Sequence, residues 1–349
     1  MSLRIFGVGF LSLAVLAGCQ RENNRAPVVD NNAKVTPAQV EEKKSAPTVA
    51  EDELPSVEIE KVQKFIKANK IDALSFLSSS LGPGKVTMVG EHHEYEANLL
   101  AKSIAESLPI LKQLKKLKYV FVEIDRKHQT QIDKIDYSLP DSEIKNHLRK
   151  IVKGGKTEDG VFDIVISAKK NCLNLFCLDY YPPLSDGKTL DDIEKISEKD
   201  PWIAMGMQSA WKNDINIQNE RDQKMFDSVI EKLGKEGNGL IYIGEKHVNK
   251  KELSNKFSDR DKDVSYKSLG SRLATYYGNS NVTSSRFVGS ERGFNGIPSR
   301  IDPVSKFVEE TREPIFLPDV PPVQGYPYIY FGGTDYVAVV NAPELSRKK

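Results

Sequence analysis

The stretch VTMVGEHH, residues 86–93, joins a short apolar run to a glycine, a glutamate and two histidines. The run at 86–89 follows a Gly-Pro-Gly turn at 82–84 and stops at Gly90. Short apolar runs bounded by turn-forming residues are typical of buried β-strands. Because both faces of this run are apolar, it predicts a strand inside a sheet that is covered on both sides.

Three further apolar runs of the same kind follow along the chain. Each ends at a glycine or an acidic residue: residues 119–122 at Glu123, residues 175–178 at Asp179 and residues 240–243 at Gly244. Segments with helical spacing of apolar residues separate the runs, as over residues 98–116. Strands that are apolar on both faces and alternate with helices predict an α/β fold, a mostly parallel β-sheet with helices packed on both faces.

The remaining sequence predicts further helices and two late strands within one domain at residues 56–349. This domain is large, so we expect a helical insertion or lid around residues 132–170. Asp200 followed by Pro201 is typical of a helix start, and Gly234 of a helix end. The other expected helices are at 57–69, at 200–232 and at 266–277, with a short one that begins at Asp72. Two strands are expected at 328–331 and 336–340, and a loop through Pro314, Pro318, Pro321, Pro322 and Pro327.

The pattern Gly-Glu-x-His occurs twice, each time directly after a predicted strand. The first copy is at residues 90–93 and the second at residues 244–247. The carboxyl ends of parallel strands lie at one edge of a sheet, where ligands of such folds bind, so we expect both motifs to face a common crevice. Together with Glu123 and Asp179, they supply two imidazoles and up to four carboxylates.

Such a cluster has two chemical uses, and the residues alone leave both open. A divalent metal would neutralise the carboxylates, accept neutral imidazoles and polarise a bound water. Without a metal, neighbouring carboxylates raise one another's pKa, and a His and Glu pair can activate water as a general base. Both routes predict a hydrolase of ester or amide bonds that acts on a small molecule or a peptide.

The order of these short motifs resembles that of the Tiki superfamily, which groups Tiki proteases, TraB proteins, erythromycin esterases and the haem-binding ChaN lipoproteins. The resemblance covers residues 85–343. The residues that carry it are the two Gly-x-x-His motifs, Glu123, the segment Glu220-Arg221-Asp222-x-x-Met225, SLGSRL at 268–273 and Asp335-Tyr336.

The resemblance implies that His93, His247 and Glu123 form the site. These three residues would also hold the divalent ion (Mn, Co or Zn) on which Tiki-like proteases depend, whereas the esterases are thought to use His and Glu directly. Glu91 matches the esterase and ChaN branches, and Arg221 is expected to order a carboxylate through a bidentate contact. The predicted catalytic residues are thus Glu91, His93, Glu123 and His247, supported by Asp179, Arg221 and Glu245.

The ChaN branch supplies an alternative function, a lipoprotein that binds haem for iron uptake. Haem binding needs an axial His or Tyr beside a broad apolar face. Tyr95, Tyr180 and Tyr181 lie near the predicted edge of the sheet. A third candidate is a surface protein whose ancestral site has lost its chemistry.

Residues 1–19 have the pattern of a lipoprotein export signal. A positive charge at Arg4 precedes an apolar segment, residues 5–17, that is too short to span a bilayer. The signal ends in the lipobox Leu16-Ala17-Gly18-Cys19. We therefore expect Cys19 to be lipidated and to anchor the protein in a membrane.

Residues 20–55 predict a disordered tether between this anchor and the folded domain. The segment has no aromatic residue and contains four prolines, so it cannot bury enough surface to fold. Gln20, next to the lipidated cysteine, favours the outer membrane of a Gram-negative host, with the protein facing the periplasm.

The overall composition restricts the partners. The chain has 50 Lys and Arg residues against 49 Asp and Glu residues. It therefore lacks the excess of positive charge that attracts a nucleic acid. The chain contains only three cysteines, so no disulfide framework holds the fold together. The sequence leaves open whether Cys172 and Cys177 pair, and it does not indicate an oligomeric state.

Overall fold

The computed structural model describes residues 56–91, 97–114, 116–152, 159–184, 186–197, 199–254, 265–289, 311–319 and 333–341. The predicted export signal with Cys19 and the predicted tether at residues 20–55 lie outside this range, and so do His93 and Tyr95. Within it, no helix combines the length and the apolar character needed to cross a membrane.

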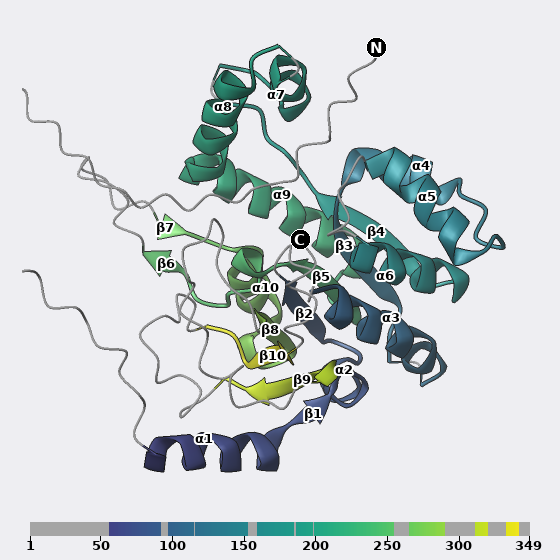
Figure 1. The fold of residues 1–349 in the computed structure, drawn as a ribbon, viewed down its shortest axis with the longest axis vertical. Coiled ribbons are helices and arrows are strands. Elements are labelled where there is room, and N and C mark those ends of the chain that lie inside the picture. Colours follow the sequence, from purple (N-terminus) through teal and green to yellow (C-terminus); the bar gives the residue numbers. More distant parts are fainter. Residues whose placement is uncertain are drawn as a thin grey trace, which may run out of the picture.

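An eight-stranded sheet forms the centre of the described structure, in the order β1-β9-β10-β8-β2-β5-β3-β4 (Figure 1). Its five neighbouring pairs from β10 to β4 are parallel, and β9 pairs antiparallel with β10 and β1. The predicted mostly parallel α/β fold is therefore confirmed. The strands are β1 (Ile71–Asp72), β2 (Val86–Glu91), β3 (Tyr119–Asp125), β4 (Asn174–Asp179), β5 (Gly239–Gly244), β8 (Val282–Gly289), β9 (Thr311–Pro318) and β10 (Tyr336–Asn341).

Helices cover both faces of the sheet. One face packs against α2 (Ala73–Ser80), α3 (Ala97–Gln113) and α6 (Asp159–Lys170), and the other against α9 (Ile215–Leu233) and α10 (Leu269–Tyr277) (Figure 1). Side chains alternate along β3, so that Val120 and Val122 face the α3 side while Phe121 faces the α9 side. The hydrophobic core is therefore split into two layers by the sheet.

Shorter elements complete the described fold. Two helices, α7 and α8, follow β4 and lie beyond the carboxyl ends of β3 and β4 (Figure 1). The remaining elements are α1 (Ser56–Asn69), α4 (Gln129–Asp133), α5 (Asp141–Val152), α7 (Leu190–Ser197), α8 (Pro201–Asn213), the 3₁₀ turns η1 (Arg126–His128), η3 (Glu245–His247) and η4 (Asn279–Asn281), and the separate antiparallel pair β6 (Leu253–Ser254) and β7 (Ser265–Tyr266).

The predicted helix at residues 200–232 is two helices. Asp200 caps α8 as expected, because its carboxylate accepts a hydrogen bond of 3.1 Å from the Ile203 N–H. The chain then breaks at Asp214, which has extended backbone angles and caps α9 through the N–H groups of Asn216 and Ile217. A second capping residue inside an otherwise helical pattern thus marks a new helix.

Two expectations for the last third of the chain are wrong. Pro314 and Pro318 belong to strand β9 and not to a loop. Proline is tolerated there because β9 lies near the antiparallel edge of the sheet, where β1 pairs with only two of its residues. Helix α10 begins at Leu269, three residues later than predicted, after its cap Ser268. The predicted strand at 328–331 lies outside the described residues.

The segment at 132–170, predicted to be a helical insertion or lid, forms α5 and α6. Helix α6 belongs to the connection between the parallel strands β3 and β4 and packs in the core against α3. The contact depends on Gly160, whose N–H donates a 2.7 Å hydrogen bond to Asn98 Oδ1. Both cysteines of the domain are free thiols; Cys172 is exposed, and burial raises the pKa of Cys177 to about 12.

We predict that Gly160→Ala destabilises the fold, whereas Gly206→Ala does not. A Cβ at Gly160 would lie 2.8 Å from the Asn98 Cα and 2.8 Å from the Ala101 Cβ, so the two helices would have to separate, at a cost of about 1–3 kcal/mol. A Cβ at Gly206, in α8, meets nothing within 4 Å, and alanine there should add up to about 1 kcal/mol of stability. Urea denaturation of both variants measures the difference, and equal midpoints would contradict the described packing of α6 on α3.

Candidate functional site

Glu123 and Asp179 stand at the carboxyl ends of the neighbouring strands β3 and β4. Glu123 is two residues beyond Phe121, so its side chain shares the face that α9 covers. On α9, Arg221 lies four residues from both Ile217 and Met225, which places it in the buried stripe of the helix. The strand alternation and the helical period therefore bring the guanidinium to the two carboxylates.

Arg221 binds both carboxylates. Its Nε and Nη2 donate hydrogen bonds of 2.7 Å to the two oxygens of Asp179, and Nη2 also donates one of 2.6 Å to Glu123 Oε1. Asp179 is fully buried, and the side chains of Glu123 and Arg221 are about one-tenth exposed. Burial alone would lower the pKa of Arg221, but the charges of Asp179 and Glu123 raise this pKa well above its usual value. The predicted bidentate contact of Arg221 is present.

The second oxygen of Glu123 explains the glycine of the second motif. Glu123 Oε2 accepts a hydrogen bond of 2.5 Å from the Gly244 N–H at the end of β5. A Cβ on Gly244 would lie 3.0 Å from this oxygen, so any larger residue would crowd it. Glu123 is thereby fixed from both sides as an oriented carboxylate.

His247 lies at the end of η3, directly after β5, and is buried. Its Nδ1 is 2.6 Å from Oδ1 of Asp222, and the Tyr266 hydroxyl donates to the other oxygen of Asp222. A carboxylate that accepts at both oxygens requires a proton on Nδ1, which leaves Nε2 as the basic nitrogen of the neutral ring. His247 Nε2 lies 3.8 Å from Glu123 Oε1.

Sequence reasoning did not select Asp222 and Tyr266 as site residues. The signal for Asp222 is an acidic residue next to Arg221 and three residues before the buried Met225, which places it on the inner half of α9. Tyr266 has no such local signal, because it reaches the site from the two-residue strand β7. Burial and the charge of Asp222 raise the pKa of Tyr266 well above its usual value, so its hydroxyl stays a donor.

Glu91, a predicted catalytic residue, is buried at the end of β2. It lies two residues beyond Val89, whose side chain packs on the α3 side of the sheet. Tyr242 lies on the same side, where its hydroxyl donates to the Ala97 carbonyl at 3.4 Å. Burial and the charges of both Glu91 and Glu123 raise the pKa of Tyr242 well above its usual value, so the two glutamates act on the same tyrosine.

The glycine of the first motif has a packing role. A Cβ on Gly90 would lie 2.9 Å from the Ser285 carbonyl and 3.0 Å from the Glu245 Cα, so its absence lets η3 pack against β2. Glu245 is half-buried at the first position of η3, two residues before His247. The strand end of the first motif therefore supports the turn that carries His247.

Two of the three predicted metal ligands, Glu123 and His247, belong to the described residues. No group of three His, Cys, Asp or Glu side chains suited to a metal occurs in the described ranges, and His93 lies outside them. Glu123 Oε1 already accepts a hydrogen bond from the Arg221 guanidinium, and Oε2 accepts one from the Gly244 N–H. The positive charge of Arg221 would repel a cation at Oε1.

Two aromatic side chains close the outer side of the cluster. The Arg221 guanidinium lies 5.3 Å from the ring centre of Tyr181 and 5.7 Å from that of Trp211. Trp211 is held by a 2.8 Å hydrogen bond from its indole N–H to the Pro182 carbonyl. Stacking of this kind stabilises a buried guanidinium and excludes water from its ion pairs.

Comparison with known proteins establishes the fold and no more. No protein-family model and no curated protein matches the sequence. Two solved structures align with TM-scores of 0.51, a Bacillus cereus protein (12% identity, 81% of this chain and 97% of that one) and a succinoglycan biosynthesis protein (11% identity, 83% and 98%). Identities this low show a likeness of fold alone.

Two further solved structures belong to the branches that the sequence resembles. They are ChaN of Campylobacter jejuni, described with cofacial haem (TM-score 0.40, 14% identity, 64% of this chain and 88% of that one), and the erythromycin esterase EreC (TM-score 0.44, 10% identity, 83% and 95%). TM-scores below 0.5 carry no argument about activity.

We predict that Arg221→Ala lowers the free energy of unfolding by about 3–5 kcal/mol, because it leaves two carboxylates buried without their cation. The matched control is Arg149→Ala. Arg149 pairs with Asp159 at the surface, where each side chain is about one-third exposed, and its loss should cost less than about 1 kcal/mol. Equal costs in thermal or urea denaturation would show that the Arg221 cluster is not buried as described.

Proposed function

We propose that this protein hydrolyses ester or amide bonds with His247 as the general base. The observation that carries the proposal is the contact of His247 Nδ1 with the buried Asp222 at 2.6 Å, which leaves Nε2 as the basic nitrogen, 3.8 Å from Glu123 Oε1. A histidine held by a buried carboxylate is the arrangement by which proteins fix the tautomer of a catalytic base.

In the proposed reaction, Nε2 takes a proton from water, and the resulting hydroxide attacks the carbonyl carbon of the substrate. The tetrahedral intermediate then expels the alcohol or amine, which takes the proton back from Nε2, so water is the only other reactant. Glu123, 3.8 Å from Nε2 and fixed by Arg221 and Gly244, stabilises the transient imidazolium. No step requires a metal.

Haem carriage has less support among the described residues. Tyr181 would have to lose its proton to ligate iron, but burial and the charge of Asp179 raise its pKa well above the usual value. Tyr180 borders a pocket lined by Asp125, Arg126 and Lys127, and such a surface is not a broad apolar face. The experiment below also detects haem binding.

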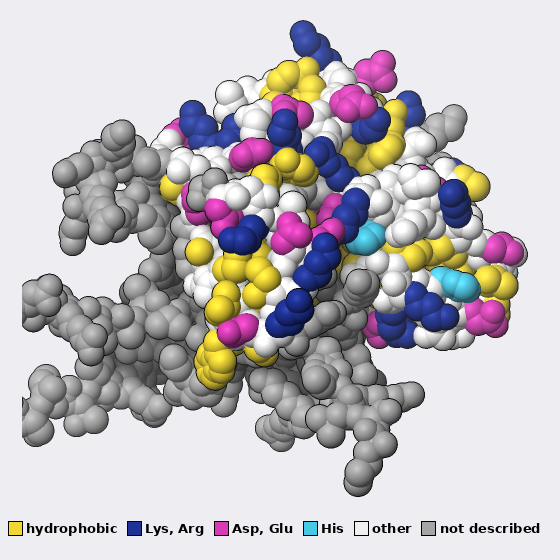
Figure 2. Space-filling model, turned by 90° about the horizontal axis from the view of Figure 1, so that it is seen from above, with side chains coloured by type: hydrophobic (Ala, Val, Ile, Leu, Met, Phe, Trp, Pro, Cys, Tyr) yellow, Lys and Arg dark blue, Asp and Glu magenta, His cyan; other side chains and the backbone are white. Residues whose placement is uncertain are grey.

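We also propose the setting in which the enzyme acts. The lipobox at Cys19 supports an extracytoplasmic lipoprotein tethered to a membrane, in the outer membrane and facing the periplasm if the host is Gram-negative. The substrate would be a small molecule or a peptide. Basic and acidic side chains are interspersed over the described part of the face in Figure 2, which favours such a substrate over a nucleic acid.

We predict that the purified chain hydrolyses members of a panel of 4-nitrophenyl esters and peptide anilides. His247→Ala and Asp222→Asn should each lower kcat by about 10²- to 10⁴-fold, because one removes the base and the other removes the acceptor that fixes its tautomer. The control is His147→Ala, which changes an exposed histidine of α5 and should leave kcat unchanged.

The same preparation separates the alternatives. Dialysis against a chelator should leave the rate unchanged, and titration with haem should give no Soret band. The metal-free mechanism would be contradicted if the chelator abolished hydrolysis and Mn, Co or Zn restored it. A Soret band without hydrolysis of any substrate would replace the proposal with haem carriage.

A further inference from the structure

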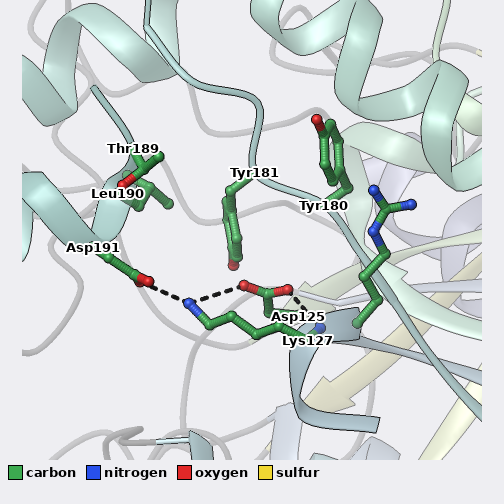
Figure 3. A pocket seen from close by; sticks show the side chains of 8 residues that line it. Asp125, Lys127, Tyr180, Tyr181, Thr189, Leu190 and Asp191 are labelled. Carbon is green, nitrogen blue, oxygen red and sulfur yellow. Dashed lines mark hydrogen bonds and ion pairs between the residues drawn. The ribbon is translucent and has the colours of Figure 1, made fainter. Parts of the chain in front are cut away.

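A pocket of about 330 Å³ lies beyond the ends of β3 and β4 (Figure 3). Its volume is in the range of sites for small ligands. The pocket is lined by residues that follow β3 and β4 and by the start of α7: Asp125, Arg126, Lys127, Tyr180, Tyr181, Thr189, Leu190 and Asp191. We call it the Arg126 pocket.

The two aspartates of the pocket are already paired. Lys127 Nζ lies 2.7 Å from Asp191 Oδ1 and 3.2 Å from Asp125 Oδ2, and Figure 3 shows it between them. Burial alone would lower the pKa of Lys127, but its hydrogen bond to Asp191 and the charge of Asp125 raise it, so Lys127 stays charged. These three residues fasten α7 to the end of β3 and leave Lys127 little capacity for a ligand.

Arg126 differs from Lys127. Its guanidinium lies 4.2 Å from the ring centre of Tyr180, and no ion pair joins it to any residue of the described ranges. A guanidinium that is stacked on a ring is held in orientation while its N–H donors remain in the plane of the group, where they match the two oxygens of a carboxylate or a phosphate. Arg126 is thus the cation of this pocket that can take an anion.

Tyr181 stands between the pocket and the Arg221 cluster. Tyr181 lines the pocket, and its ring also faces the Arg221 guanidinium, which binds Glu123. Arg126 and Glu123 are three residues apart on the same strand end. A ligand in the pocket would therefore contact Tyr181, whose other neighbour is the guanidinium that orients Glu123.

We infer that the Arg126 pocket binds an anionic oxygen group of the substrate, a carboxylate or a phosphate, through the guanidinium stacked on Tyr180. The inference rests on the proposed function, and it narrows the substrates to esters or amides that carry a negative charge. The lining has two acidic and two basic side chains, so the selectivity comes from the donors of Arg126 and not from an excess of positive charge.

The test compares two esters of similar size, 4-nitrophenyl butyrate, which is neutral, and the 4-nitrophenyl monoester of succinate, which carries a free carboxylate. Arg126→Gln should raise KM for the succinate ester by about tenfold and leave kcat for this ester unchanged. For the butyrate ester, the variant should change neither KM nor kcat. Arg126→Lys should restore part of the affinity. Lys188→Gln, which removes an exposed charge outside the pocket lining, is the matched control and should change nothing.

Competition identifies the source of the anion. If succinate inhibits the wild type more strongly than Arg126→Gln, the pocket binds a carboxylate. If inorganic phosphate shows this difference instead, the pocket binds a phosphate. An unchanged KM for the succinate ester in Arg126→Gln, with the wild-type melting temperature, overturns the inference.

Equilibrium dialysis keeps this test separate from the test of catalysis. If the wild-type chain hydrolyses neither ester, radiolabelled succinate and phosphate still report on the pocket. Binding to the wild type that is lost in Arg126→Gln supports an anion site even though the proposed hydrolase fails. Absence of binding to the wild type overturns the anion site as well.

Discussion

The buried guanidinium of Arg221 is the constraint on which the site depends. An arginine inside a protein needs acceptors for its donors, and here Asp179 and Glu123 supply them from two adjacent strands. This ion pairing fixes the register of α9 against the carboxyl ends of β3 and β4. Because Asp222 is the next residue of the same helix, the register that satisfies Arg221 also sets the position of the carboxylate that binds His247.

The site therefore joins two polar contacts that have different uses. Glu123 accepts hydrogen bonds from Arg221 at Oε1 and from the Gly244 N–H at Oε2, so it is an oriented charge. The contact between Asp222 and His247 engages only Nδ1 and leaves Nε2 as the basic position. In the proposed hydrolysis, the first contact stabilises charge and the second allows proton transfer.

The sequence predicts the central sheet because four of its strands are continuous apolar runs that end in polar residues, as Val86–Glu91 shows. It does not predict β8, whose alternating and polar residues, among them Ser284 and Arg286, resemble a loop. The same limit applies to the site. Glu123 and His247 follow from strand ends, whereas the contribution of Tyr266 depends on a two-residue strand distant in sequence.

The central claim is that Asp222 holds neutral His247 with its proton on Nδ1 and its Nε2 free to accept one. Nitrogen NMR of the chain labelled with ¹⁵N at histidine, assigned by comparison with His247→Ala, measures this directly. We predict a protonated Nδ1 and an unprotonated Nε2 in the neutral ring, and a loss of that preference in Asp222→Asn. A proton on Nε2 in the unmodified protein would contradict the claim, because His247 could not then act as a base through Nε2.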